Sequence, residues 1–306
     1  MPRLIPLAFA LLGLLALVPA PAPAPAETRP LGFGHFLNND ALGDGKDRWQ
    51  TGSYTLSWLR GPEWQGRLPG RPFEILEYRL SGAVIAPSRL KSLRGDRRYV
   101  GKSAVSLHTQ FAPTPQTEAD LGLGVVWTGP ANGLSGVQRQ LHDLLGEPRP
   151  RAADSQLPNH LYPTVSAEIA RPIALGRAEL RPFAEARAGD ETLLRLGADL
   201  AFGQREKGAL WLRDEVTGQR HLGIGGTDAG GTAFVLGADV AHVFDSAYLP
   251  GGWGVQPEQT RSRLRAGIST RLGRVGLFYG LTWLSREFVG QPEGQLVGSV
   301  RLRLRF

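Results

Sequence analysis

Apolar and polar residues alternate along most of the chain. Between residues 177 and 188, one face carries Arg and Glu with one Phe, and the other carries Ala and Leu with one Pro. The same alternation recurs near 31–39, 51–60, 73–84, 101–111, 119–128, 191–203, 233–243, 263–271, 275–288 and 300–306. Successive side chains of a β-strand point to opposite faces of its sheet, so a period of two predicts strands. We therefore expect an all-β fold.

The length and face composition of these segments favour a transmembrane antiparallel β-barrel over a soluble β-sandwich. Strands of about ten residues with alternating faces are typical of outer-membrane barrels. The apolar faces are rich in Ala and Leu, whereas the dense Arg and Glu of the other faces suit a narrow lumen filled with paired charges. The last alternating strand ends on Phe306, a pattern similar to the signal that the barrel assembly machinery recognises. Bacterial barrels have an even number of strands, so we predict twelve and leave 208–226 unassigned.

The N-terminal segment predicts export. Arg3 precedes an apolar run from Leu4 to Val18, and residues 1–26 are expected to be a signal peptide that is removed before Glu27. Residues 27–306 would then form one outer-membrane barrel domain.

The amino-acid composition excludes several kinds of site and fold. The 306 residues include no Cys, which excludes disulfides, thiolate catalysis and Cys-based zinc sites. With 40 Gly and 23 Pro, the chain does not suit a helical bundle. The net charge is +7, but the Arg residues are spaced along strands rather than clustered, so we expect no nucleic-acid partner.

One segment departs from the β pattern. Residues 134–145 place apolar side chains at positions 134, 137, 141, 144 and 145, which is the spacing of an amphipathic helix. Gly146 and Pro148 would end this helix. Gln138 and His142 are four residues apart and therefore share one face.

The candidate catalytic and binding residues lie on three predicted extracellular connections. If the N-terminus is periplasmic, the connections 40–50, 87–98 and 130–161 all lie outside, and they carry carboxylates, cations and His142. A His beside a carboxylate or a metal can activate water for ester hydrolysis, and a divalent cation can stabilise the oxyanion.

Simpler interpretations of the same residues stay open. From spacing alone, His142 is more simply a surface residue of a helix, and Asn39-Asp40 is equally a turn after a strand. Residues 44–47 are similar to part of a calcium loop but lack a full ligand set. The other five His show no spacing typical of metal ligands.

Several short motifs, taken in order, resemble the lipid A 3′-O-deacylases of Gram-negative outer membranes. The similar elements are Asn39-Asp40, Asp47-Arg48-Trp49-Gln50-Thr51-Gly52-Ser53, Asp96-Arg97-Arg98-Tyr99-Val100-Gly101, Thr128-Gly129-Pro130, the helix with Gln138 and His142, and Ser285-Arg286-Glu287-Phe288-Val289-Gly290-Gln291. These motifs span nearly the whole mature chain. Gln50 and Arg98 stand where the family has Tyr and Pro.

The resemblance implies an outer-membrane hydrolase that removes the 3′-linked acyloxyacyl group of lipid A with a bound calcium ion. His142 would deprotonate the attacking water, and Asp40 would hold the calcium. The residues expected to orient His142 or the substrate are Asn39, Thr51 and Gln138. The partner would be lipopolysaccharide of the outer leaflet, and we expect a monomer.

Two basic side chains are further candidates for the site, and three alternative functions stay open. Arg97 and Lys102 are candidates for contacts with the substrate. The alternatives are a catalytically inactive barrel of the same family, a calcium-dependent phospholipase that uses the same chemistry, and a small porin, which would need an open lumen.

Overall fold

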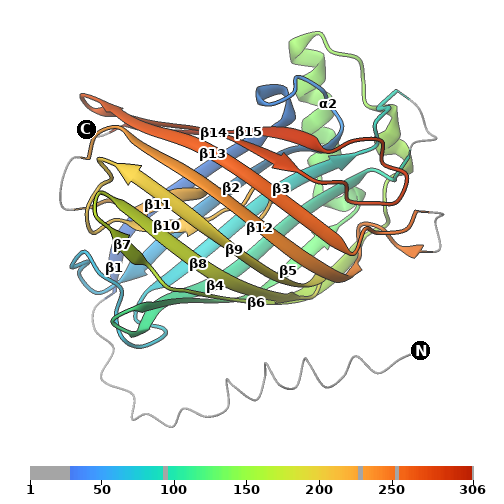
Figure 1. The fold of residues 1–306 in the computed structure, drawn as a ribbon. Coiled ribbons are helices and arrows are strands. Elements are labelled where there is room, and N and C mark those ends of the chain that lie inside the picture. Colours follow the sequence, from blue (N-terminus) through green and yellow to red (C-terminus); the bar gives the residue numbers. More distant parts are fainter. Residues whose placement is uncertain (1–27, 92–95, 227–229, 252–254, 305–306) are drawn as a thin grey trace, which may run out of the picture.

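The chain folds into a closed antiparallel barrel of twelve strands (Figure 1). The computed structural model describes residues 28–91, 96–226, 230–251 and 255–304, so the predicted signal peptide (1–26) and Phe306 lie outside the described residues. The wall consists of β1 (Arg29–Asn39), β2 (Trp49–Gly61), β3 (Leu76–Ala86), β4 (Val100–Thr114), β5 (Thr117–Thr128), β6 (His160–Ala170), β8 (Ala178–Ala188), β9 (Glu191–Gly203), β12 (Ala233–Ser246), β13 (Thr260–Leu272), β14 (Val275–Leu284) and β15 (Gln295–Leu304).

Each strand pairs with its neighbours along the chain, and two pairings close the barrel. The β1 strand pairs with β15, and β6 pairs with β8, while the short β7 (Ile173–Leu175) adds to β8 near this second closure. Closure removes the exposed edges that an open sheet of this size would leave. The predicted all-β barrel and its strand number are confirmed.

The segment left unassigned in the sequence forms a hairpin inside the barrel. This hairpin joins β10 (Leu210–Arg213) and β11 (Arg220–Ile224). Its backbone approaches β1 so closely that a Cβ on Gly32 would lie 2.3 Å from the carbonyl oxygen of Gly223. Its strands have only 4 and 5 residues, so its sequence offers little alternation to detect.

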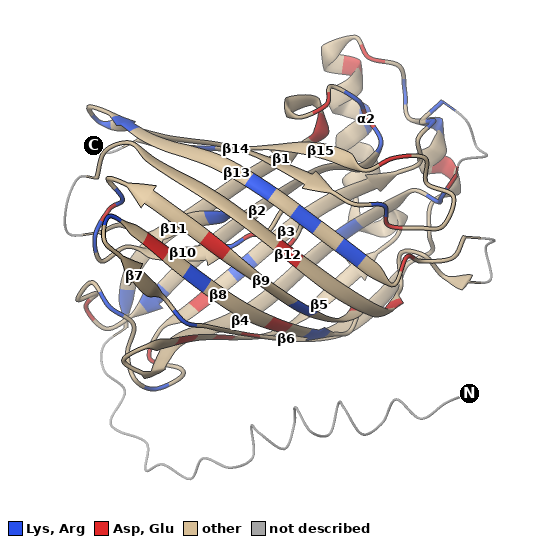
Figure 2. Cartoon of the chain, viewed as in Figure 1, with Lys and Arg blue, Asp and Glu red and all other residues tan. Residues whose placement is uncertain are grey.

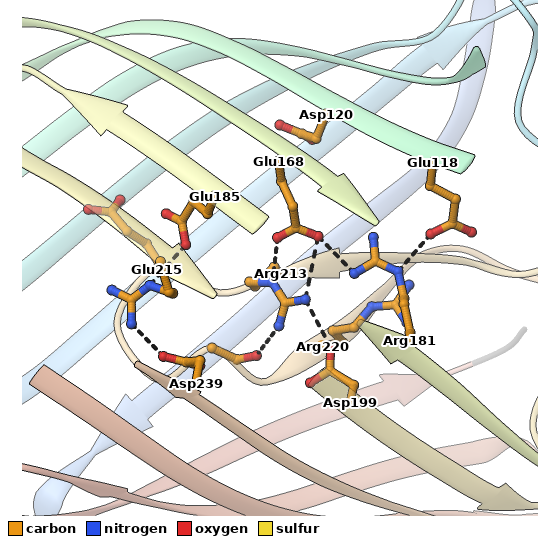
Figure 3. A network of polar contacts seen from close by, with 12 residues as sticks. Glu118, Asp120, Glu168, Arg181, Glu185, Asp199, Arg213, Glu215, Arg220 and Asp239 are labelled. Carbon is orange, nitrogen blue, oxygen red and sulfur yellow. Dashed lines mark hydrogen bonds and ion pairs between the residues drawn. The ribbon is translucent and has the colours of Figure 1, made fainter. Parts of the chain in front are cut away.

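Charged residues recur along the strands of the wall and in the hairpin (Figure 2), and their side chains pair between the two (Figure 3). Arg213 of β10 binds Glu168 of β6 and also Asp199 of β9, the latter at 2.8 Å. Arg181 of β8 binds Glu118 at 2.7 Å and Glu168 at 2.8 Å. Buried charges are tolerated when they are paired in this way. The predicted charge-filled lumen is therefore present, and it disfavours the porin alternative.

The outer face of the wall is apolar, as a strand that contacts lipid requires. Its exposed side chains include Trp58, Tyr78, Leu80, Val105, Leu123, Leu196 and Leu264. In the part of the chain that the structure describes, no helix has the length and apolar character needed to cross a membrane.

The helical elements gather at the end of the barrel opposite to the start of β1 (Figure 1). They are η1 (Asp40–Leu42), η2 (Pro130–Asn132), α2 (Leu134–Leu145) and η3 (Arg151–Ser155). The α2 helix has the predicted bounds. It ends at Gly146, whose φ of 72° is left-handed and whose N–H donates to the carbonyl of His142.

Candidate active site between α2 and the barrel wall

The α2 helix begins against the outer wall of the barrel. Lys102 points into the lumen, where it binds Glu215 of the hairpin segment, so its neighbour Gly101 faces outward. Gly82 of β3 also faces outward, and Leu134 of α2 lies over both glycines. A Cβ on either glycine would lie 3.3 Å from Leu134 atoms. The small residues of the wall therefore let the helix pack closely against it.

The amphipathic character of α2 is the reverse of that of a helix in a water-soluble protein. Its buried residues are the polar Ser135, Gln138 and His142. Its apolar residues face outward, with Leu144 82% and Leu145 65% exposed. An amphipathic helix in water buries its apolar face. Here the polar face covers the connections at the end of the barrel, and the leucines extend the apolar outer surface.

Two hydrogen-bond partners orient the imidazole of His142. Its Nδ1 lies 2.8 Å from the carbonyl oxygen of Pro148, and its Nε2 lies 3.1 Å from Oδ2 of Asp47. A carbonyl oxygen only accepts hydrogen bonds, so Nδ1 carries a proton and donates it. The turn at Gly146 and Pro148 that ends α2 thus directs Nε2 towards the connection between β1 and β2.

Gln138, one turn before His142, is held by a buried tyrosine. The hydroxyl of Tyr99 donates to Oε1 of Gln138 at 2.9 Å. The Tyr99 ring is fully buried among Ala86, Ala152 and Ala153, which join the wall to η3. The Nε2 of Gln138 is buried and has no hydrogen-bond partner among the described residues. This amide is therefore fixed on one side and free to donate on the other.

Thr51 reaches the site through a β-bulge. The pairing of β2 with β3 shifts between Gln50 and Gly52, so Thr51 is the extra residue. A bulge redirects a side chain from the regular alternation. The Oγ1 of Thr51 and Oδ1 of Asp47 are both buried, and no other described residue forms a hydrogen bond with either atom. Burial raises the pKa of Asp47, and the nearby His142 and Thr51 lower it in part.

Asp40 is a buried carboxylate without a cationic partner among the described residues. Its Oδ2 accepts from the backbone N–H of Arg48 at 2.8 Å and from Gln295 at 3.4 Å. The Arg48 guanidinium instead binds Asp44 and Glu293. Burial is the main cause that raises the pKa of Asp40 to about 8, and the negative charges of Asp47 and Asp44 add to it.

A hard divalent cation fits this carboxylate. Calcium binds carboxylate and carbonyl oxygens, and a cation would offset the buried negative charge that no side chain here compensates. Asp40 is the residue that could hold it.

Asn39 shapes the loop that carries Asp40. Its Oδ1 accepts from the backbone N–H of Ala41 at 2.8 Å and so caps η1. The preceding Asn38 points into the lumen and binds Ser53 and Asp214. The structure thus places Asn39 where it supports the connection that also carries Asp47.

The two candidate substrate cations lie in buried ion pairs. Arg97 pairs with Glu287, and Lys102 lies 2.8 Å from Glu215 and 3.7 Å from Asp190. Lys102 is therefore on the lumenal side of the wall, away from α2. Glu287 also accepts a hydrogen bond from the side-chain amide of Gln50 at 2.7 Å, so Arg97 and Gln50 share this carboxylate.

The contacts of Asp47 and Pro148 with His142, and of Tyr99 with Gln138, were not predicted from the sequence. Asp47 and Tyr99 lie within the quoted motifs, and that position was the available signal. The acceptor role of Pro148 had no signal, because it depends on the path of the backbone after α2. A further group, Glu77, His108 and Asp120, was also missed because its members come from three strands.

Comparisons with known proteins agree with this architecture. The model of the family described as outer membrane protein LpxR matches residues 7–306. The solved structure of LpxR from Salmonella typhimurium superposes with a TM-score of 0.72 at 17% identity, covering 90% of this chain and 100% of that one.

Other similarities are weaker. The NanC porin gives a TM-score of 0.43 at 5% identity, with 90% of this chain and 100% of that one covered. The β domain of the Bordetella autotransporter BrkA gives 0.41 at 12% identity, with the same two coverages. No curated protein matches the chain. The family match spans the barrel and the loops of the site, and the chain is therefore an outer-membrane β-barrel that belongs to the LpxR family, as its resemblance to the lipid A 3′-O-deacylases indicates.

Proposed function

We propose that the protein hydrolyses the ester that links the 3′ acyloxyacyl group to lipid A, at the site between α2 and the outer wall. The observation that carries this proposal is the placement of His142. Its Nε2 faces a carboxylate on the wall side of a helix whose other side exposes leucines. A water-activating group at the outer surface of the barrel suits a substrate that resides in the membrane.

The surroundings favour a lipid with a polar, anionic head. The leucines of α2 extend the apolar outer surface, which suits acyl chains, whereas the connections behind them carry charged and amide side chains. Lipid A has both parts, and its ester groups lie where they meet. The outer leaflet, which holds lipopolysaccharide, is the leaflet that α2 would contact.

His142 acts as the general base. The Pro148 carbonyl holds Nδ1–H, so Nε2 is the atom that takes a proton from water in the state in which no proton lies between Nε2 and Asp47. The water oxygen attacks the ester carbonyl carbon, the bond to the 3′ oxygen breaks, and His142 returns the proton to that oxygen. The products are a free fatty acid and lipid A with a free 3′ hydroxyl. A positioned base of this kind contributes about 10²–10⁴-fold to the rate.

The other residues orient the reactants. The N–H of Gln138 and the hydroxyl of Thr51 can hold the water or the ester, since no described residue accepts from the former and only Asp47 lies near the latter. Asp47 would hold the imidazolium that forms when His142 takes the proton. Asp40 would hold calcium, which when bound would polarise the ester carbonyl.

Purified protein tests this proposal against the phospholipase and the inactive barrel. The folded protein is incubated in detergent with lipid A or with a glycerophospholipid, with calcium or with EDTA, and the products are identified by mass spectrometry. We expect release of the 3′ acyl group from lipid A with calcium only. Hydrolysis of the glycerophospholipid instead would indicate the phospholipase, and no product from the folded barrel would indicate the inactive relative.

A further inference from the structure

A cavity of about 110 Å³ lies in the lumen, on the other side of the wall from α2. Its lining includes Ser106 and His108 of β4 and Asp120 of β5, together with Arg79. Ser106 is partly exposed to this cavity. None of these residues takes part in the His142 site.

Three of these side chains are joined in a fixed order. The Oγ of Ser106 lies 3.0 Å from Nε2 of His108, and Nδ1 of His108 lies 2.9 Å from Oδ1 of Asp120. The carboxylate can accept a proton from Nδ1, which leaves the lone pair of Nε2 facing the serine hydroxyl. This order of hydroxyl, imidazole and carboxylate is the one that activates a serine as a nucleophile.

The strand register builds this arrangement. Ser106 and His108 are two residues apart and share the lumenal face of β4, opposite Gly124 and Gly122 of β5. A Cβ on Gly122 would lie 2.5 Å from Cε1 of His108, and one on Gly124 would lie 2.6 Å from Cβ of Ser106. The two glycines therefore provide the space that the serine and the imidazole occupy.

The neighbouring groups support the same role. Gln110 donates to Oδ2 of Asp120 at 2.7 Å and fixes the carboxylate. Arg79 lies opposite Ser106 in the register of β3 and β4, and Glu77 holds its guanidinium at 2.7 Å and 3.0 Å. A guanidinium beside the nucleophile can stabilise the negative charge of an oxyanion.

A metal site is a weaker interpretation of the same cluster. Glu77, His108 and Asp120 offer ligand atoms within 4.8 Å of one another. However, both oxygens of Glu77 already accept from Arg79, and Gln110 donates to Glu77 and to Asp120 at 2.7 Å. The arginine supplies the positive charge that a metal ion would otherwise bring.

We propose that Ser106, His108 and Asp120 form a second nucleophilic centre, inside the barrel, that reacts with small acyl donors such as esters of short carboxylic acids. The Oγ of Ser106 attacks the acyl carbon, its proton passes to Nε2 of His108, and the bond to the alcohol oxygen breaks as that oxygen takes the proton. Water then hydrolyses the acyl-serine by the same proton route. The size of the cavity excludes the acyl chains of lipid A, so this centre is separate from the proposed deacylase.

Methanesulfonyl fluoride is a probe small enough for this cavity. Attack by Oγ of Ser106 on sulfur breaks the S–F bond, fluoride leaves, and His108 takes the proton. We treat the folded, detergent-solubilised protein with the probe and locate the adduct by peptide mass spectrometry. We expect modification of Ser106 and none of Ser57, which is fully buried and donates to Glu77 at 2.6 Å.

Variants test whether the neighbours activate the serine. His108→Gln and Asp120→Asn should each slow modification of Ser106 by on the order of 10²-fold or more. Ser106→Ala should abolish the adduct and leave lipid A hydrolysis unchanged, which separates this proposal from the deacylase. Mobility on unheated gels reports whether each barrel is folded, and either of the two slowing variants suffices if the other does not fold.

Three results would overturn the proposal. They are the absence of an adduct on Ser106 in the folded wild-type protein, modification of Ser106 no faster than that of a serine in a short peptide, and a rate in the folded variants equal to that of the wild type.

Discussion

His142 is oriented by the backbone rather than by a second side chain at Nδ1. The carbonyl of Pro148 accepts from Nδ1–H, and this contact leaves Nε2 as the only position that can accept a proton. The orientation therefore depends on the turn at Gly146, where φ is 72°. A substitution of Gly146 by a residue that disfavours this left-handed conformation would therefore shift the imidazole, although position 146 itself lies far from the ester.

The contact between Tyr99 and Gln138 predicts the effect of a single substitution on activity. Tyr99→Phe removes the donor to Oε1 of Gln138 and leaves a buried carbonyl unsatisfied, at a cost of about 1–3 kcal/mol. We expect kcat on lipid A to fall about tenfold with little change in KM, because the amide is no longer held in place. The matched control is Tyr78→Phe, whose ring is exposed on the outer wall. Equal activity of the two variants would refute a positioning role for Tyr99.

Asp40 predicts how the calcium requirement depends on pH. The pKa of this carboxyl is raised to about 8, so a proton competes with a cation below that pH. The calcium concentration for half-maximal activity should fall about tenfold for each pH unit up to pH 8 and level off above it. Calcium titrations at several pH values measure this. A requirement that does not change with pH would contradict the assignment of calcium to Asp40.

At the scale of elements, α2 is positioned by the contrast between its two faces. Its polar face packs on the connections at the end of the barrel, and its leucines are exposed on the other side. The sequence predicted the helix and its bounds but not which face would be buried, because periodicity alone does not distinguish water from lipid as the surrounding solvent.

The exposed leucines provide a test of this arrangement. The double variant Leu144→Ser, Leu145→Ser should lower hydrolysis of lipopolysaccharide in membranes about tenfold or more, because each buried leucine contributes about 1.5–3 kcal/mol to apolar contact. Hydrolysis of lipid A dispersed in detergent should change little. Asp143→Asn is the control, since Asp143 lies on the same helix and binds the exposed Arg149 at 2.9 Å. Loss of both activities, or of neither, would contradict a lipid-facing role for α2.

The strands were predictable because a half-exposed strand alternates, and most segments identified in the sequence are strands of the wall. The β10–β11 hairpin was not predictable, because its strands have only 4 and 5 residues and show little alternation. The site was predictable only in part. His142, Gln138 and Asp40 lie in motifs, whereas the β-bulge that redirects Thr51 depends on a pairing register that the sequence does not display.

At the scale of the whole molecule, a hairpin and its ion pairs occupy part of the lumen. The inward-facing residues of many strands meet the β10–β11 hairpin through ion pairs (Figure 3). Lys102 illustrates the consequence for sequence reasoning, because the alternation that places it on a strand also directs it inward to Glu215. Its lumenal position follows from closure of the barrel, which no local motif shows.

The central arginine of this network predicts a stability effect. Arg213→Met leaves Glu168 and Asp199 with fewer partners, and breaking a buried ion pair costs about 3–5 kcal/mol. We expect this variant to unfold at a lower midpoint concentration of urea than the wild-type protein, as measured by tryptophan fluorescence. Arg205→Met is the control, because its pair with Glu179 is more exposed and contributes about 1 kcal/mol or less. Equal midpoints for the two variants would contradict the role of the network in holding the hairpin.

The proposed hydrolysis of lipid A depends most on His142, and the role of this residue can be measured directly. The protein and its His142→Ala variant are expressed in a Gram-negative host with standard hexa-acylated lipid A, and the mass spectrum of lipid A is recorded for each. We predict loss of one acyloxyacyl unit with the wild-type protein and an unchanged spectrum with the variant, provided that both barrels are folded. An unchanged spectrum with the folded wild-type protein, or the same loss with the variant, would contradict the account.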